Sequence, residues 1–416
     1  MEELIRCSRI LLGNRVSIAY SIDMRILIIS NLYPPHVLGG YEILCGQVVT
    51  HLTARGHEVH VLTSDFRDGT SSKDVTRSLR VYQDFEKSAS FMRGARIRTA
   101  RHNRKETMKL LREREFDVAF VWSLLRLTPA SAHVVQKAGL PTVYTFNDEN
   151  ITSFSSHPFS FSPKQAAHSF LDRLFPFTTL RNLDFTYTTC ISRILKNNLL
   201  AKHIPLESSK VIYQGIPVEK FPLKENPGVM KSPARILYVG QLHSYKGVHT
   251  IIEALMIMMS KENAVPCSLT IVGKGTEEYT RTLKEMASRA PFDIEFRGLV
   301  AHDELPSIYR QMDIFIFPSI WEEPFGLTHL EAMASGLPVI STVNGGQGEF
   351  LSEGENALTF PPDDPLSLCE QLERLTGDEA LYAGLCKNGR KTVEEHFSFD
   401  RYVTDLEKLL ADATGK

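Results

Sequence analysis

The sequence lacks a disulfide-like cysteine pattern and any long hydrophobic run. Its 416 residues include six cysteines, none of them in a Cys-x-x-Cys pair or in a His/Cys cluster with zinc-ligand spacing. This argues against a disulfide framework and a zinc site, and favours reduced, partly buried thiols. No uninterrupted apolar stretch reaches the roughly 18 residues that a membrane-spanning helix needs. We therefore expect a cytoplasmic protein.

The sequence also has no large excess of charge of either sign. The formal net charge is −2, so the chain has no overall attraction to nucleic acid, and we expect no nucleic-acid partner. Residues 1–23 are too polar, and their apolar part too short, for a secretory signal. We interpret them as an extension outside the fold, with an amphipathic membrane anchor as the alternative.

Strand-length apolar runs alternate with helix-length segments. The run at 25–30, a helical pattern ending near Gly56, and a second run at 58–62 form a βαβ unit. Such continuous apolar runs are typical of parallel strands that are buried on both faces. Further strands are expected at 117–121, 142–145, 186–191, 236–239, 269–272, 294–296, 314–317 and 338–340.

Five prolines between residues 205 and 234 interrupt this alternation and indicate an interdomain hinge. We predict an α/β protein with two Rossmann-like parallel-sheet domains facing across a cleft, because ligands of such sheets bind at the carboxyl ends of the strands. The predicted parts are the extension 1–23, a first Rossmann-like domain 24–213, a second Rossmann-like domain 214–395, and a C-terminal helix 396–416 that crosses back to the first domain.

The most informative segment runs from residue 318 to residue 340. Glu323 precedes a helix that starts near Gly326, and Glu331 lies more than one turn inside it. The helix N-terminus offers free amides and a partial positive charge between the two carboxylates. This layout suits a nucleotide sugar, with one carboxylate on the ribose diol and the other on the sugar. Two solvated helix charges are the alternative.

The same segment resembles the signature of the family-4 retaining glycosyltransferases. That pattern, E-x-F-G-x-x-x-x-E-A-M-A-x-G-x-P-V-I, is matched at every fixed position from Glu323 to Ile340. The resemblance covers roughly residues 24–413 and implies the GT-B fold, with 24–213 as the acceptor domain and 214–395 as the nucleotide-sugar donor domain. It also implies that Glu323 lies near the donor sugar hydroxyls and Glu331 on the ribose. Further donor-binding residues in this segment would be Phe325, Gly326, Leu327 and Thr328.

The loop at 240–247 is similar to the family's G-R-L-x-x-x-K-G sequence. The resemblance assigns Lys246 to the donor diphosphate, where a cation stabilises the leaving group without a metal. Gln241 stands where the family usually has arginine, and it can donate a hydrogen bond but carries no charge. Gly273 belongs to a turn similar to the family's V-G-x-G. A surface lysine and a simple turn are the alternatives.

Two segments of the first half carry weaker signals. Gly39 and Gly40 end a loop that resembles the family's Y-P-P-x-x-G-G sequence, and we assign them to donor binding, because paired glycines let backbone amides approach a ligand closely. Asn147 and Asp148 follow a strand where family members often carry His-Asp, and we assign them to the acceptor side. Asn147 can bond a sugar hydroxyl but cannot titrate.

A basic segment at 91–105 and an apolar segment at 168–183 could seat the protein on an anionic membrane or a lipid-phosphate acceptor. A solvated basic helix and a core helix are the alternatives. Peripheral contact with the inner face of the cell membrane is therefore the second localisation that we consider.

Together these features predict a retaining, metal-independent hexosyltransferase-type enzyme with catalytic residues Glu323 and Lys246 and no cofactor. It would move a sugar from a UDP- or GDP-sugar to a glycan, lipid-linked or small-molecule acceptor. A non-catalytic nucleotide-sugar-binding relative is one rival, favoured by Gln241 and Asn147. A sugar-nucleotide epimerase of the same fold is the other.

Overall fold

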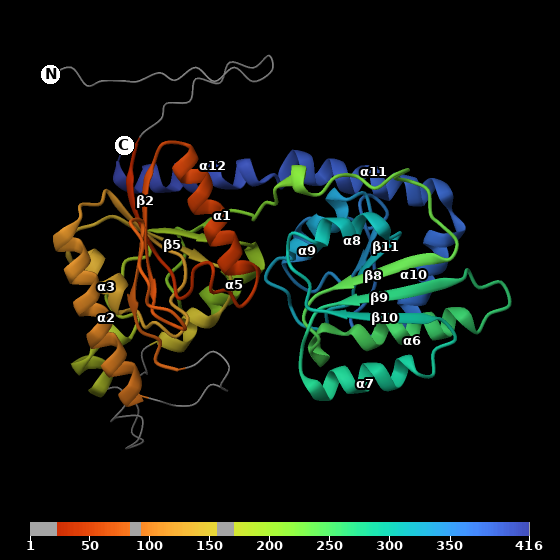
Figure 1. Cartoon of the computed structure of the whole chain (residues 1–416), viewed down its shortest axis with the longest axis horizontal. Helices are drawn as coiled ribbons and strands as arrows, with labels where there is room; N and C mark the ends of the chain where they lie inside the picture. Colours follow the sequence, from red (N-terminus) through yellow and green to blue (C-terminus); the bar gives the residue numbers. More distant parts are fainter. Residues whose placement is uncertain (1–22, 84–92, 156–169, 416) are drawn as a thin grey trace, which may run out of the picture. The chain divides into compact units, whose positions relative to one another are not determined.

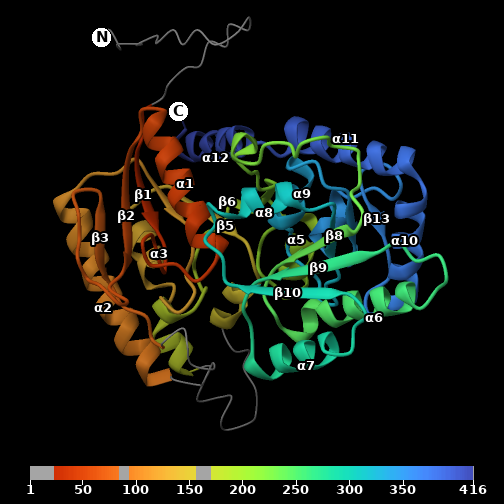
Figure 2. The same cartoon turned by 45° about the vertical axis from the view of Figure 1, so that its right-hand side comes forward.

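The computed structural model describes residues 23–83, 93–155 and 170–415. The chain forms two compact units, and Figures 1 and 2 show the elements of each. Unit 1 takes the chain up to Cys190, Lys196–Val211 and the chain from Val403 onward; unit 2 takes Ile191–Leu195 and Ile212–Tyr402. The predictions for residues 1–22, 91–92 and 168–169, and that for Cys7, lie outside the described residues.

Unit 1 contains a seven-stranded parallel sheet in the order β3-β2-β1-β4-β5-β6-β7. Its strands are β1 (Arg25–Ile29), β2 (Glu58–Ser64), β3 (Val75–Leu79), β4 (Val118–Val121), β5 (Thr142–Phe146), β6 (Tyr187–Cys190) and β7 (Lys210–Val211). Its helices are α1 (Gly40–Ala54), α2 (Arg93–Glu113), α3 (Ala130–Lys137) and α5 (Arg193–Ala201), with short 3₁₀ turns η1 (Asn150–Phe154) and η2 (Pro176–Thr178).

Unit 2 contains a six-stranded parallel sheet in the order β10-β9-β8-β11-β12-β13. The strands are β8 (Ala234–Val239), β9 (Cys267–Val272), β10 (Asp293–Gly298), β11 (Ile314–Phe317), β12 (Val339–Ser341) and β13 (Leu358–Thr359). The other elements are η3 (Val218–Lys220), η4 (Ser244–Lys246), α6 (Val248–Met259), α7 (Glu277–Ala287), α8 (Leu305–Gln311), α9 (Leu327–Ala334), η5 (Gly346–Glu349), α10 (Pro365–Gly377), α11 (Glu379–His396) and α12 (Phe399–Thr414).

The expected strands form where continuous apolar runs are buried between helices. β1, β4, β8 and β11 are buried almost throughout, as parallel strands covered on both faces require. In unit 2, α6 and α7 cover one face of the sheet and α8 and α9 the other (Figure 2). Both sheets share the first six places of the doubly wound strand order, and the alternation of strand and helix predicted from the sequence is confirmed.

Each unit contains an equivalent arginine–aspartate pair that joins two neighbouring strands in the centre of its sheet. In unit 1, the Asp117 carboxylate accepts hydrogen bonds from the backbone amide (2.7 Å) and the guanidinium (3.1 Å) of Arg25. In unit 2, the Asp313 carboxylate accepts from the backbone amide (3.1 Å) and the guanidinium (2.8 and 3.0 Å) of Arg235. Each pair connects the amino ends of neighbouring strands, β1 with β4 and β8 with β11.

Unit 2 adds a lysine to this pair. Lys224 is buried, donates to the Tyr382 hydroxyl at 2.7 Å and lies 3.6 Å from an Asp313 carboxylate oxygen. Burial lowers the pKa of Lys224, although the Cys386 thiol and Asp313 act in the opposite direction. The result is a buried network of charges at the base of the second sheet.

The C-terminal part of α12 packs within unit 1. Glu407 accepts from Arg55 at 2.6 Å and pairs with the ring of His57 at 2.9 Å, at the end of α1 and the start of β2. The hydrogen bond with His57 is the main cause that lowers the pKa of Glu407. These contacts tie the last helix of the chain to the first βαβ unit.

The five cysteines within the described residues are free and buried. Burial raises the pKa of Cys190 to about 12 and that of Cys267 to about 11, which keeps both thiols protonated at neutral pH. No described helix is both long enough and apolar enough to cross a membrane.

Candidate active site

The candidate site lies at the carboxyl ends of β8 and β11, two neighbouring strands of unit 2 whose following strands lie on opposite sides of them in the sheet. β8 is followed by β9 on one side, whereas β11 is followed by β12 on the other. In open α/β sheets, ligands bind at such a switch point, beyond the carboxyl ends of the strands. The loops 240–247 and 318–326 both leave the sheet at this point, and they carry both predicted catalytic residues, Lys246 and Glu323.

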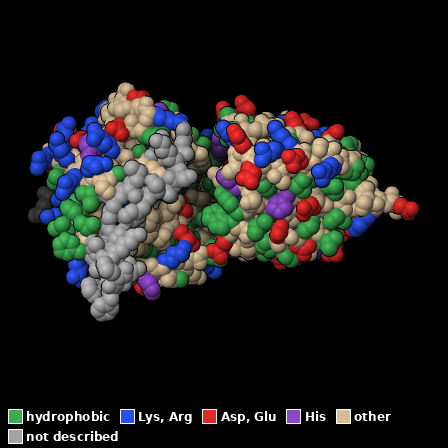
Figure 3. Space-filling view, turned by 90° about the horizontal axis from the view of Figure 1, so that it is seen from below, with side chains coloured by type: hydrophobic (Ala, Val, Ile, Leu, Met, Phe, Trp, Pro, Cys, Tyr) green, Lys and Arg blue, Asp and Glu red, His purple; other side chains and the backbone are tan. Residues whose placement is uncertain are grey.

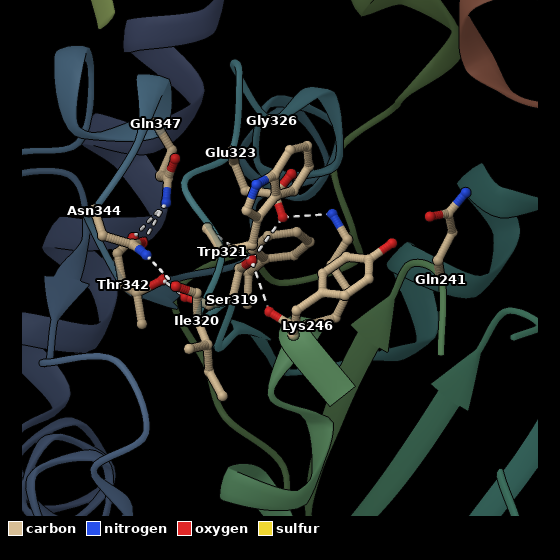
Figure 4. Close-up of polar contacts among 12 residues, drawn as sticks. Gln241, Lys246, Ser319, Ile320, Trp321, Glu323, Gly326, Thr342, Asn344 and Gln347 are labelled. Atoms are coloured by element: carbon tan, nitrogen blue, oxygen red, sulfur yellow. Dashed lines mark hydrogen bonds and ion pairs between the residues drawn. The ribbon is translucent and has the colours of Figure 1, made fainter. Parts of the chain in front are cut away.

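Lys246 and Glu323 come from these two loops and form a direct ion pair. The Lys246 Nζ lies 2.5 Å from Glu323 Oε1, and the two residues are only 8% and 7% exposed. The Ser319 hydroxyl donates to the same carboxylate oxygen at 2.6 Å. The ammonium group also lies 4.9 Å from the ring centre of Trp321, a cation–π distance (Figure 4). Opposite charges are thus paired where both side chains are largely shielded from solvent.

The loop after β12 holds the backbone of Glu323 in place. The Gly346 amide donates to the Glu323 carbonyl at 2.7 Å, and the Asn344 side chain donates to the Ile320 carbonyl at 2.8 Å. A Cβ at Gly345 would lie 2.4 Å from backbone atoms of Glu323, so no larger residue fits there. The Asn-Gly-Gly sequence therefore positions Glu323 through close backbone packing.

Glu331 is held by two side chains that precede β11. Its two carboxylate oxygens contact the Tyr309 hydroxyl at 2.9 Å and the His302 ring at 3.3 Å. Glu331 is buried, and burial is also the main reason that the pKa of Tyr309 lies well above its ordinary value. The hydrogen bond to Glu331 raises the pKa of His302 against the effect of burial. Both neighbours therefore fix the orientation of the Glu331 carboxylate.

Gly326 introduces helix α9 with a backbone that favours glycine. Its φ is +122°, and a Cβ there would lie 2.6 Å from the His329 ring. His329 is fully buried, and burial lowers its pKa to about 3, so the ring is neutral and bonds Ser341 at 2.8 Å. Phe325 is buried, whereas Leu327 and Thr328, the first residues of α9, are half-buried beside Gly326.

The other two donor-site residues of unit 2 stand apart from the ion pair. Gln241 is exposed, and Figure 4 shows its side chain separate from Lys246 and Glu323. Gly273 has a φ of +143°, and a Cβ there would lie 1.8 Å from the Gly240 carbonyl oxygen. Gly273 therefore permits two loops at the carboxyl edge of the sheet to touch through their backbones, and no ligand is needed to explain it.

The residues predicted in unit 1 lie at the carboxyl end of its own sheet. The Gly39 amide donates to Glu42 at 3.0 Å, and a Cβ at Gly39 or Gly40 would meet nothing within 4 Å. Asn147 and Asp148 line a small pocket that Tyr41 also lines. Burial raises the pKa of Asp148, whose carboxylate accepts from the backbone and side chain of Asn150.

Sequence reasoning missed several side chains around the predicted site. Ser319 lies in the segment 318–340, four residues before Glu323, so its proximity to Glu323 could have drawn attention to it. His302 and Tyr309 lie 29 and 22 residues before Glu331 and carry no local signal. Glu42, with a pKa raised by burial, lies two residues after Gly40 and was also missed.

Solved structures with similar folds define the class of protein. Sucrose-phosphate synthase from Thermosynechococcus elongatus superposes with a TM-score of 0.69 at 20% identity, covering 94% of this chain and 99% of its own. Anabaena HepE in complex with UDP-glucose gives a TM-score of 0.66 at 18% identity, covering 94% and 100%. With the two doubly wound units, these likenesses establish the GT-B fold of glycosyltransferases.

Sequence comparison leads to the family. The family model Glycosyltransferase Family 4 matches residues 38–220, and Glycosyl transferases group 1 matches residues 220–392. An uncharacterised glycosyltransferase of Methanocaldococcus jannaschii is 26% identical over 94% of this chain and 100% of its own length. The glycogen synthase of Mycobacterium tuberculosis is 28% identical over 92% and 93%. The chain belongs to the family-4 glycosyltransferases of group 1, as its motifs predict.

Proposed function

We propose that this glycosyltransferase moves a hexose from a UDP- or GDP-sugar to an acceptor hydroxyl with retention at the anomeric carbon. The observation that carries the proposal is the buried pair of Lys246 and Glu323 at the switch point of unit 2. A cation and a carboxylate at one strand-end edge offer partners for both halves of a nucleotide sugar. The complex of Anabaena HepE with UDP-glucose supports a donor of this class.

In this proposal Lys246 neutralises the donor diphosphate. Without donor, its charge is balanced by Glu323; a diphosphate would replace that partner and free the carboxylate for sugar hydroxyls. As the bond between the anomeric carbon and the phosphate oxygen breaks, negative charge grows on the nucleoside diphosphate, and Lys246 stabilises it. The exposed Gln241 and the amides of Gly326, Leu327 and Thr328 assist at the phosphates.

Glu331 binds the ribose diol, and Tyr309 and His302 orient it. Glu323 faces the transferred sugar, whose anomeric carbon becomes more positive as the leaving group departs. The acceptor oxygen attacks from the face that the diphosphate leaves, and its proton passes to a donor phosphate oxygen. This route conserves the anomeric configuration and needs no protein base, so Asn147 in place of a titratable histidine does not oppose it.

Charge neutralisation by Lys246 also underlies the proposal that the enzyme needs no metal. The test is nucleotide release from a panel of UDP- and GDP-sugars, measured with and without EDTA. We expect one donor class to be consumed at the same rate in both conditions. Loss of activity in EDTA with recovery in Mn²⁺ would refute metal independence without affecting the assignment of the donor site.

A non-catalytic nucleotide-sugar-binding protein is the second candidate function, and the exposed, uncharged Gln241 is the observation that favours it. The two candidates differ in the same nucleotide-release assay, because a pure binder is stabilised by the donor and releases nothing. A donor at 100 times its dissociation constant adds about 2.7 kcal/mol to stability in either case. An epimerase of the same fold would return an epimeric nucleotide sugar, with no net release of nucleotide and no glycoside formed.

A further inference from the structure

Helix α2 of unit 1 carries a row of cations on one exposed face. Five exposed residues follow helical spacing along it, and we call them the basic stripe: Arg98, Arg101, Lys105, Lys109 and Arg112. The one exposed acid of this helix within the described residues is Glu113, which lies 4.0 Å from Lys109 at the C-terminal end. The N-terminal three members of the stripe therefore form a surface of one sign.

Exposed apolar side chains accompany the stripe. Phe170 is 65% exposed and Leu174 is 56% exposed, and both lie in a helical segment at residues 170–174. Arg173 is exposed between them, whereas Asp172 is buried, so the outward face of this segment is apolar and cationic. Met108 adds a further exposed apolar side chain on α2.

The basic stripe and the apolar segment belong to one surface. The guanidinium of Arg101 lies 5.3 Å from the ring centre of Phe175, and that of Arg104 lies 4.8 Å from the ring centre of Phe177. These contacts join α2 to the residues that follow Leu174. Figure 3 shows Lys and Arg side chains gathered on unit 1, at the left, next to a group of hydrophobic side chains.

We propose that this surface docks unit 1 onto an anionic lipid bilayer. Cations at the headgroup level are attracted by acidic lipids, while aromatic and aliphatic side chains beside them enter the acyl boundary. The long stems of arginine and lysine allow the charges to reach the headgroups around the inserted apolar groups. The structure thus separates the apolar segment predicted from the sequence into an exposed part at Phe170 and Leu174 and a buried part at Leu180 and Leu183.

The position of α2 connects the bilayer to the acceptor. This helix leads from β3 to β4, so its N-terminal half starts at the carboxyl edge of the first sheet, the ligand-binding edge. Arg96 donates to the Ser153 carbonyl beside the loop that carries Asn147 and Asp148. A bilayer bound at the basic stripe would therefore present a lipid-anchored acceptor to that edge of the sheet. This link between the bilayer and the acceptor rests on the proposed glycosyl transfer.

The test is co-sedimentation of the full chain with vesicles, without donor or turnover. One set contains phosphatidylcholine with phosphatidylglycerol, and the other contains phosphatidylcholine alone. The stripe variant is Arg98→Glu with Lys105→Glu, and its matched control is Lys387→Glu with Lys391→Glu, two exposed lysines of α11 in unit 2. The apolar variant is Phe170→Ser with Leu174→Ser. Circular dichroism confirms that all variants are folded.

We expect the wild type and the control to bind the anionic vesicles only, and more weakly in high salt. The stripe variant should bind at least about 25-fold more weakly, since each basic residue near the surface is worth about fivefold. The apolar variant should also lose binding. Equal binding of the stripe variant and the control would overturn the proposal. So would wild-type binding by the apolar variant, because the surface would then be a site for soluble polyanions. Neither result affects nucleotide release, which tests the proposed function separately.

Discussion

The two units share a strand order and an arginine–aspartate pair but differ at their switch points. In unit 2 the loops after β8 and β11 bring together Lys246 and Glu323. In unit 1 the corresponding position, beyond β1 and β4, is occupied by Tyr41 and Trp122, whose rings stack at 5.3 Å. The same backbone arrangement thus holds charges in one unit and an aromatic pair in the other. The fold determines where a ligand can bind, and the loop residues determine which chemistry is available there.

Removing the aspartate of the arginine–aspartate pair should give the largest difference between the two units, in the free energy of unfolding that each unit loses. Asp313 is 1% exposed and binds both Arg235 and Lys224, whereas the side chain of Asp117 is 20% exposed beside a half-exposed Arg25. Asp313→Ala leaves two cations without their buried partner and should destabilise unit 2 by about 3–5 kcal/mol. Asp117→Ala removes a screened ion pair and one backbone hydrogen bond, and should cost unit 1 about 1–2 kcal/mol.

The chain contains two tryptophans, Trp122 in unit 1 and Trp321 in unit 2, so each unit can be observed separately. Urea unfolding of single-tryptophan variants, with the other tryptophan replaced by phenylalanine, measures the two losses. Asp313→Asn is the control, because it retains an acceptor for the Arg235 amide. Equal losses of unfolding free energy in the two units would show that the deeper burial of the Arg235–Asp313 pair does not increase the cost of removing its aspartate.

The charged switch point is tested by Lys246→Ala. If Lys246 stabilises the leaving diphosphate, kcat should fall by about 10²–10³-fold, as when a preorganised transition-state donor is removed. Lys387→Ala and Lys391→Ala, at two exposed lysines of α11, should leave donor turnover unchanged. Turnover by Lys246→Ala at the rate of these two controls would contradict the role of the cation.

The two carboxylates of the motif should fail in different ways. Glu331→Ala should weaken nucleoside diphosphate binding by about 2–4 kcal/mol, roughly 30- to 1,000-fold, because its ribose contacts are similar in the ground and transition states. Glu323→Ala should lower kcat more than it raises donor KM, because its partner becomes more positive during the reaction. Titration calorimetry with the free nucleotide separates the two; unchanged binding in both variants, with normal turnover, would reject both assignments.

Much of this fold could be predicted from the sequence, because strands buried on both faces must be apolar throughout. β3 was missed, since Arg77 interrupts it; that side chain reaches the Tyr33 and Pro34 carbonyls instead of solvent. The two-residue strands β7 and β13 are too short for any periodicity to indicate them.

The motif indicated Lys246 and Glu323 separately, but their direct contact joins positions 77 residues apart and depends on the strand order. Nothing local distinguishes Tyr309 and His302 from other residues near α8, since only the packed sheet brings them to Glu331. For Gly273 there are two possible reasons for a glycine. It matches a donor-loop pattern, and its close backbone contact with Gly240 by itself requires a residue without a side chain. Pattern matching thus finds the residue types, whereas tertiary packing decides their partners.

The smallest expected effects concern a histidine–carboxylate pair in each unit, and they should depend on pH with opposite signs. In unit 2 the hydrogen bond to Glu331 raises the pKa of His302 above its ordinary value. That contribution to stability is complete below the pKa of the unfolded histidine and is lost as pH rises through the raised pKa. In unit 1 His57 and Arg55 lower the pKa of Glu407. That contribution is present above the pKa of the unfolded glutamate and is lost as pH falls through the lowered pKa.

Thermal melts test this difference, for His302→Gln between about pH 5 and pH 9 and for Glu407→Gln between about pH 2 and pH 7. Each pair is partly exposed and screened, so we expect at most about 1 kcal/mol, or about 2–4 °C in the melting temperature of a unit of this size. The gap between wild type and His302→Gln should be widest at acid pH and close toward alkaline pH. For Glu407→Gln the gap should be widest near neutral pH and close toward acid pH, because a protonated Glu407 no longer attracts His57 and Arg55. If the two gaps changed with pH in the same direction, one of the pairs would be held by packing and not by charge. A gap for His302→Gln that does not change with pH would rule out an electrostatic link between His302 and Glu331.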